Sequence, residues 1–207
     1  MGSPEVVPRA ERLLALLREQ TYATDLDGTI YDLLGGIISH LRDHHNIHKQ
    51  REDVTSYNLA GFTGDELADR AIINLFSDPR FYFNLRPMPG AVEAMRRLRE
   101  HGRIVAVTSR PVNAHIVTKL ALARDFGLGV IDERVYFTKA KARECQVLRA
   151  RAMFEDHPET AQKVAAKGIR TYLLSSPYMG EVRRSRHLRV VSSISEAVAD
   201  LTAPVGV

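Results

Sequence analysis

A regular alternation of apolar segments with helical segments, from Pro89 to about position 201, most constrains the fold of this chain. Apolar spacing predicts helices at 90–101, 112–126, 141–148, 158–167 and 193–201, and strands at 103–108, 134–137, 151–154, 169–174 and 188–191. Strands that alternate with helices predict a parallel sheet that helices cover on both faces. We therefore expect an α/β fold.

The part of the chain before Pro89 has a different character. Residues 5–20 have the spacing of an amphipathic helix, and residues 21–24 have that of a short buried strand. The stretch that follows is rich in histidine and has helical spacings instead of the alternation of strands. We expect it to form a small helical cap, inserted directly after the first strand. This predicts a core of residues 1–32 and 88–207 and a cap of residues 33–87.

The composition limits the class of protein. At 207 residues the chain is one ordinary domain, or one domain with a modest insertion. No run approaches the ~18 apolar residues of a membrane span, and the polar N-terminus has no signal-peptide segment. A single cysteine, Cys145, excludes an intramolecular disulfide and fits a reducing compartment. We expect a cytoplasmic protein with no membrane partner, and the net charge of +4 decides nothing further.

Two acidic residues follow the first predicted strand. Side chains at i and i+2 of a strand share a face, so Asp25 and Asp27 are expected to point the same way. Open α/β sheets bind ligands at this end of their strands. Two carboxylates this close suit Mg²⁺, with one free to attack and the other to carry a proton. The alternative is an Asp-Gly turn with two solvated acids.

Three more polar motifs follow in order. Thr108 and Ser109 end one apolar strand, Lys141 follows the next, and Glu155-Asp156 end a third. With the segment Asp25-Leu26-Asp27-Gly28-Thr29, this set resembles the four motifs of the haloacid dehalogenase-like (HAD) phosphohydrolases. The resemblance implies a Rossmann-like core and a phosphatase.

The HAD resemblance also implies a role for each of these residues. Asp25 would be the nucleophile, and Asp27 the acid and base. Thr108 would donate a hydroxyl to the phosphoryl group, and Lys141, favoured over Lys139, would neutralise charge. Mg²⁺ would be held by Asp25, the Asp27 carbonyl and Asp156, with Glu155 on a metal-bound water. Residues that could bind the substrate are Thr29, Ser109 and Arg110, although Arg110 could equally be a solvated loop charge.

The segment 81–94 resembles one particular family of HAD phosphohydrolases. This segment contains an aromatic pair, the sequence Leu-x-Pro-x-Pro-Gly-Ala and a Glu-Ala pair. All three are similar to the 5'(3')-deoxyribonucleotidase family, as is the stretch 52–58. This resemblance implies small phosphorylated substrates, nucleoside monophosphates first and deoxy forms before ribo forms. The chain departs from the family in having Glu155-Asp156-His157-Pro158 instead of Asp-Asp-Arg-Pro. It also has Leu33 where a base-stacking aromatic is expected. Other candidates to stack on a base are Tyr57, Phe62, Phe81 and Phe83, for which burial in the cap is the alternative role.

Several other interpretations stay open. The enzyme could act on a sugar phosphate or another small metabolite, or the chain could be a non-catalytic module that binds nucleic acid or protein. His40, His44 and His48 lie at helical spacing and could hold a metal, or form a solvated face. The basic run 183–189 could contact nucleic acid, but a solvated loop is favoured and no nucleic-acid partner is expected. A homodimer is left open.

Overall fold

The core is a six-stranded sheet in which all neighbouring strands are parallel. The computed structural model describes residues 20–203 except 58, 60, 177–178 and 184. The strand order is β3-β2-β1-β4-β5-β6. The strands are β1 (Thr21–Thr24), β2 (Arg103–Thr108), β3 (Tyr136–Phe137), β4 (Ala152–Glu155), β5 (Arg170–Leu174) and β6 (Leu188–Val191).

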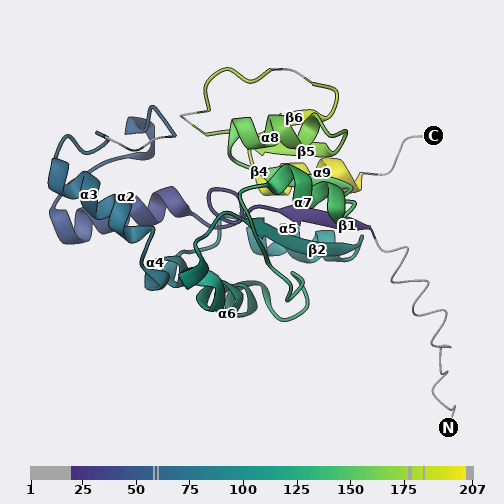
Figure 1. Ribbon diagram of the computed structural model, residues 1–207, viewed down its shortest axis with the longest axis horizontal. Coiled ribbons are helices and arrows are strands. Elements are labelled where there is room, and N and C mark those ends of the chain that lie inside the picture. The colour runs from purple at the N-terminus through teal and green to yellow at the C-terminus, as the bar shows by residue number, and fades with distance from the viewer. Residues whose placement is uncertain (1–19, 58, 60, 177–178, 184, 204–207) are drawn as a thin grey trace, which may run out of the picture.

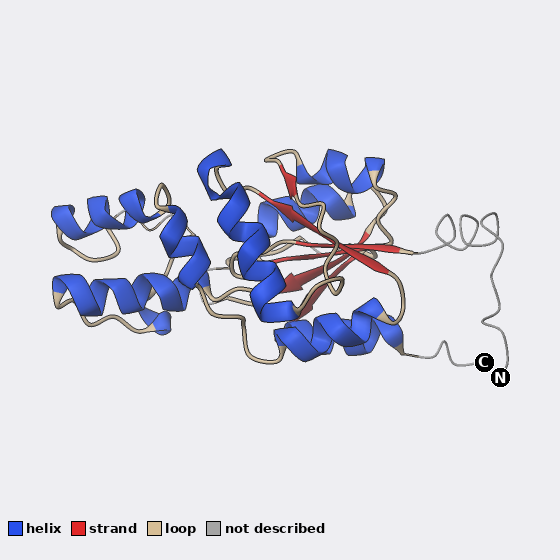
Figure 2. Ribbon diagram, turned by 90° about the horizontal axis from the view of Figure 1, so that it is seen from below, coloured by secondary structure: helices blue, strands red, loops and turns tan. Residues whose placement is uncertain are grey.

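Helices cover both faces of this sheet (Figure 2). One layer consists of α5 (Ala91–Arg99), α6 (His115–Phe126) and α9 (Ile194–Thr202), and the other of α7 (Lys141–Val147) and α8 (Pro158–Ala165). The alternation of side chains along β2 separates the two cores. Ile104 and Ala106 pack into the first layer, whereas Val105 and Val107 pack into the second. The predicted α/β class is therefore confirmed.

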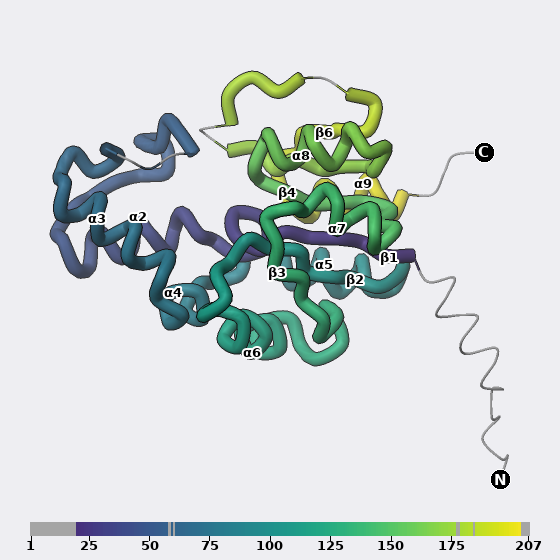
Figure 3. Tube along the Cα trace, in the orientation of Figure 1, coloured from purple at the N-terminus to yellow at the C-terminus, as the bar shows by residue number. Residues whose placement is uncertain are grey.

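The segment between β1 and β2 is helical, as predicted. It contains α2 (Leu33–His45), the 3₁₀ helix η1 (Arg51–Asp53), α3 (Glu66–Leu75) and α4 (Pro79–Asn84). Ile37 and Leu41 on α2 pack against Ile72 and Leu75 on α3, which forms a small core of its own. In Figures 1 and 3 the chain leaves β1, forms these helices at one end of the molecule, and returns through α4 to α5.

Capping fixes where the inserted helices begin. The Asp32 carboxylate accepts a hydrogen bond from the Gly35 amide at the start of α2. The Asp65 carboxylate accepts from the amides of Leu67 and Ala68 at the start of α3. Because such caps satisfy amides that have no partner within the helix, both helices begin directly after an aspartate.

Several details differ from the sequence-based expectations. The predicted helix over 5–20 lies outside the described residues, save position 20. The predicted helix over 112–126 begins with a 3₁₀ turn, η2 (Val112–Ala114), before α6 starts, and β3 has only two residues. Within the described part of the chain, every helix is too short or too polar to cross a membrane.

Candidate active site

The candidate site lies where the strand order reverses. β2 and β3 extend from one side of β1, and β4, β5 and β6 extend from the other. Ligand sites in open α/β sheets form at the carboxyl ends of strands beside such a switch point. The residues predicted from the four motifs lie at this edge: Asp25 and Asp27 after β1, Thr108 at the end of β2, Lys141 after β3, Glu155 at the end of β4 and Asp156 directly after it.

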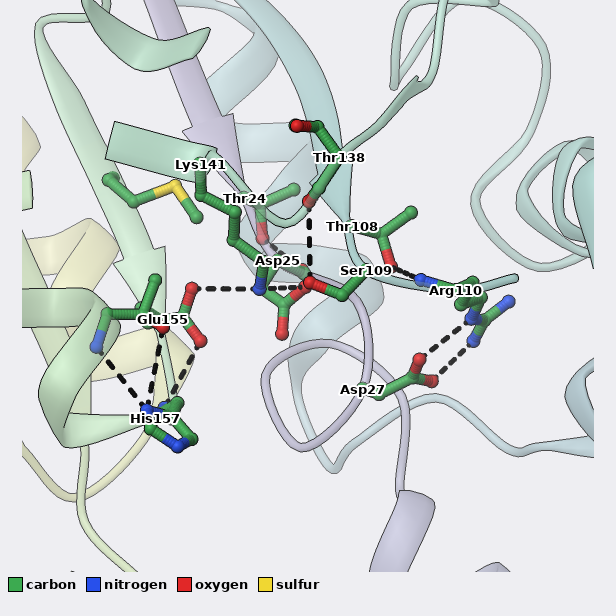
Figure 4. Close-up of polar contacts among 12 residues, drawn as sticks. Thr24, Asp25, Asp27, Thr108, Ser109, Arg110, Thr138, Lys141, Glu155 and His157 are labelled. Carbon is green, nitrogen blue, oxygen red and sulfur yellow. Dashed lines mark hydrogen bonds and ion pairs between the residues drawn. The ribbon is translucent and has the colours of Figure 1, made fainter. Parts of the chain in front are cut away.

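A buried lysine joins two of the carboxylates (Figure 4). Lys141 Nζ lies 2.7 Å from Asp25 Oδ1 and 3.0 Å from Glu155 Oε2. Burial raises the pKa of Asp25 to about 7, although Lys141 acts in the opposite direction. Burial disfavours the Lys141 ammonium, but the two carboxylates outweigh it and raise the pKa of that lysine. Lys139, the other lysine of this motif, is exposed.

Among Asp25, Glu155 and Asp156, which form an acidic group, Asp156 has a buried oxygen that lacks a partner within the described part of the chain. Its Oδ1 is buried and has no hydrogen-bond partner among the described residues. Burial, with the negative charges of Glu155 and Asp25, raises the pKa of Asp156. Ligand oxygens of Asp25, Glu155 and Asp156 lie within 4.8 Å of one another. A buried set of carboxylate oxygens with one unpaired atom fits a hard divalent cation.

Glu155 is less available to a metal than Asp156. It is completely buried, and its Oε2 accepts from Lys141 while its Oε1 accepts from the backbone N–H of His157 at 3.1 Å. Both oxygens are therefore engaged by the protein. Its predicted contact with a metal-bound water stays a prediction.

Asp27 does not face the same way as Asp25, contrary to the expectation from strand geometry. β1 ends at Thr24, and the chain then turns through Gly28, whose φ is +79°. In Figure 4 the Asp27 carboxylate points toward Arg110, whereas Asp25 points toward Lys141. The alternation of side chains ends with the strand, so it could not be extended to Asp27.

The predicted substrate-binding residues are unequally placed. The Ser109 hydroxyl is at the strand end and donates to the Thr138 carbonyl at 3.3 Å. Thr29 is completely buried, and its hydroxyl has no partner among the described residues. The Arg110 side chain has no exposed surface, so it could bind a substrate only after rearrangement. The binding roles of all three stay predictions.

A pocket of about 410 Å³ adjoins Asp156. It is lined by Leu33, Leu34, Ile37, Ser56, Tyr57, Leu59 and Phe76 from the insert and by Asp156 from the core. Of the four aromatic residues predicted to stack on a base, Tyr57 alone lines it, and Phe76 was missed. A larger hollow of about 830 Å³ lies beside α2 and α4, but the catalytic candidates do not line it.

His157 was not predicted from the sequence as a site residue. Its ring meets that of Tyr57 edge to face, with 4.2 Å between the centroids. Its Nδ1 accepts from the Thr160 amide and so caps α8, whose first residue is Pro158. Proline at the first position of a helix was the available signal that His157 is a cap. The residue that departs from the family pattern thus connects the core to the insert.

Two rival interpretations can be compared with the structure. His40 and His44 stack within α2, with 4.6 Å between their ring centroids, but His48 lies beyond the end of that helix. In the described part of the chain, the one group able to hold a metal is the acidic one. In the basic run, Arg189 pairs with Asp200 and Glu196, so its charge is partly neutralised within the protein.

Comparison with known proteins identifies the family of this chain. A sequence model of the family described as 5' nucleotidase, deoxy (pyrimidine), cytosolic type C (NT5C) matches residues 20–196. The chain belongs to this family. It is a HAD superfamily phosphatase that resembles the deoxyribonucleotidases.

Solved structures share the fold of this NT5C family member. A HAD family hydrolase from Deinococcus radiodurans, with bound phosphate and sodium, superposes with a TM-score of 0.60 at 15% identity, covering 88% of this chain and 94% of that one. The D,D-heptose 1,7-bisphosphate phosphatase from Burkholderia thailandensis gives 0.55 at 16% identity, covering 90% and 100%. The L-2-haloacid dehalogenase from Xanthobacter autotrophicus gives 0.57 at 11% identity, covering 88% and 98%. These identities support a common fold and nothing finer.

Proposed function

We propose that this protein is a Mg²⁺-dependent phosphomonoesterase that hydrolyses nucleoside monophosphates, deoxy forms first, through an aspartyl-phosphate on Asp25. The observation that carries the proposal is the contact of Asp25 with Lys141 beside the unpaired oxygen of Asp156. It supplies a nucleophile, a cation for a phosphoryl group and a candidate metal ligand at one strand end. The family match supports a nucleotide as the substrate.

The acidic group is suited to Mg²⁺. Asp25, the Asp27 carbonyl and Asp156 would hold the ion, and Glu155 would hold one of its waters. Asp25, Asp27, Glu155 and Asp156 face two cations, Lys141 and Arg110, so a divalent cation would balance their charge. When bound, Mg²⁺ orients the phosphate and shields the repulsion between the anionic nucleophile and the anionic substrate.

The reaction proceeds in two steps. An Asp25 oxygen attacks phosphorus, and the bond from phosphorus to the ester oxygen breaks while Asp27 gives its proton to that oxygen. Water then attacks the phosphorus of the aspartyl-phosphate and gives a proton back to Asp27. The bond from phosphorus to the Asp25 oxygen breaks, which releases phosphate and restores the Asp25 carboxylate. Thr108 and Lys141 stabilise the charge on the phosphoryl oxygens in both steps.

The insert supplies the substrate pocket. We assign residues 33–87 as a cap over the strand ends, because Leu33, Tyr57 and Phe76 line the pocket that adjoins Asp156. Apolar and aromatic walls suit the flat face of a nucleobase. A phosphate at Asp25 with its base in this pocket would span the junction between insert and core.

Phosphate release from a panel of substrates tests the proposal. The purified protein with Mg²⁺ is assayed on deoxynucleoside monophosphates, ribonucleoside monophosphates and sugar phosphates, beside an Asp25→Asn variant. We expect release from deoxynucleotides that vanishes in the variant. Release from sugar phosphates alone would keep the chemistry and overturn the nucleotide assignment. The absence of release from every ester would overturn the enzyme itself.

A further inference from the structure

Arg110 holds both oxygens of the Asp27 carboxylate. Its Nη2 lies 2.6 Å from Asp27 Oδ1, and its Nε donates to Oδ2 at 2.9 Å. This two-point pairing fixes the plane of the carboxylate as well as its position. In Figure 4 the pair lies apart from the contact of Asp25 with Lys141, although both aspartates follow the same strand.

The guanidinium is itself held from several sides. Its Nη1 donates to Thr118 Oγ1 on α6 at 3.1 Å, and its side chain has no exposed surface. The guanidinium carbon lies 5.2 Å from the centre of the Tyr31 ring and 4.8 Å from that of Tyr82. Arginine stacks on aromatic rings and pairs with carboxylates through one rigid fork, so little freedom remains to Arg110.

The two cations divide the carboxylates between them. Lys141 contacts Asp25 and Glu155, and Arg110 contacts Asp27. Asp25 and Asp27 repel each other, and Arg110 is the cation that pairs with Asp27 among the described residues. Without Arg110, this repulsion would drive the Asp27 carboxylate away from Asp25, and so away from a leaving group beside it.

We propose that Arg110 is a positioning residue that orients Asp27 for proton transfer to the leaving oxygen, an inference that rests on the proposed function. The two-point pairing holds the carboxylate in one orientation, and each Asp27 oxygen keeps a second lone pair that can carry the proton for the leaving group. The buried guanidinium has no surface for a substrate phosphate, so its effect on the reaction passes through Asp27.

This role predicts a dependence on the leaving group. Alkyl phosphates, such as nucleotides, expel a strongly basic oxygen that needs a proton. p-Nitrophenyl phosphate expels a stable phenolate that does not. Loss of the positioning should therefore slow alkyl phosphates selectively. A general acid contributes about 10²–10⁴-fold, so roughly 10- to 100-fold of kcat should be lost when it is misaligned.

The test compares Arg110→Lys and Thr118→Val with the wild type on thymidine 5'-monophosphate, glycerol phosphate and p-nitrophenyl phosphate. Lysine keeps the charge but cannot bind with two points, and valine removes the hydroxyl that steadies Arg110. The matched control is Arg124→Lys, because Arg124 also forms a two-point pair, with Asp125, and lies over a ring, Phe83. Melting temperatures identify variants that fail to fold, and Thr118→Val is the milder change.

We expect kcat for the two alkyl phosphates to fall in both variants, and to fall less in Thr118→Val than in Arg110→Lys. The kcat for p-nitrophenyl phosphate should change less than about 3-fold in these variants. In Arg124→Lys, kcat should be unchanged for all three esters. An equal loss on all three esters would overturn the inference. So would a raised KM with weaker inhibition by inorganic phosphate, which would make Arg110 a phosphate ligand. A wild-type protein inactive on every ester would overturn the proposed function, and this inference with it.

Discussion

Asp25 and Asp156 are buried carboxyl groups that the protein holds beside one lysine. Burial raises the pKa of Asp25 from its ordinary 3.8 to about 7. Between these two values the folded, metal-free protein retains a proton that the unfolded chain releases. The free energy of unfolding of the metal-free protein should therefore fall as the pH rises through that range. A bound divalent cation stabilises the carboxylate forms and should reverse the trend.

We predict that Mg²⁺ raises the melting temperature more at pH 8 than at pH 5, because at pH 5 protons compete for the same oxygens. At about 100 times Kd, a ligand contributes about 2.7 kcal/mol, which is roughly 5–10 °C for a domain of this size. Thermal unfolding with and without Mg²⁺ measures this. Asp156→Asn should lose most of the rise at pH 8. The proposed metal site would be contradicted if Mg²⁺ raised the melting temperature equally at both pH values, or if Asp156→Asn kept the full rise.

At the scale of single elements, the loop after β1 brings its backbone against β4. Gly28 has a φ of +79°, and a Cβ placed there would collide with the Asp156 carboxylate. Glycine therefore satisfies two requirements at this position, a left-handed backbone and a close approach. The loop and the acidic group are built together, so a change in one should disturb the other.

We predict that Gly28→Ala destabilises the protein more than Gly64→Ala does. Gly64 has nearly the same φ, +76°, but open space around its Cβ, so its substitution measures backbone strain alone. That strain costs about 1–2 kcal/mol, and the collision at Gly28 adds to it. Urea unfolding compares the two variants. Equal losses of stability in the two variants would mean that the loop after β1 moves away from Asp156 with no further loss of free energy.

The elements also show what the sequence could predict. Strands and helices from position 90 onward agree with the predicted ranges to within a few residues, because their apolar periods are clear and a glycine or proline marks the boundary of several, such as Gly90, Gly102 and Pro158. The four motifs lie at or just after strand ends, as expected, because the predicted ends of the strands agree with the observed ones. The facing of Asp27 was wrong because it depends on the turn at Gly28 and on Arg110, which is distant in sequence. The aromatic partner of His157, Tyr57, likewise comes from the insert, whose packing against the core leaves no signal in the local periodicity of the sequence.

At the scale of the whole molecule, the insert and the core each contribute a wall of the pocket beside Asp156. Tyr57 lies on the insert side, and its ring meets that of His157 on the core side. If the pocket receives a base, the insert governs the choice of substrate and the core performs the chemistry. The two roles should therefore be separable by substitution.

We predict that Tyr57→Ala raises KM for nucleoside monophosphates and leaves that for glycerol phosphate unchanged. Loss of one stacking ring costs about 1–3 kcal/mol, roughly 5- to 150-fold in affinity. Steady-state kinetics on both substrates measures the difference. Leu67→Ala is the control, since Leu67 on α3 is 75% exposed and does not line the pocket. A parallel change for both substrates would place the base elsewhere.

The most direct test of the account is to find the covalent intermediate. The enzyme is quenched during turnover of a deoxynucleoside monophosphate and treated with borohydride, which reduces an aspartyl-phosphate to homoserine. Peptide mass spectrometry then identifies the modified position. We expect homoserine at position 25 and none in an enzyme sample without substrate. Rapid phosphate release with an unmodified Asp25, or with the modification at Asp27, would contradict the central claim.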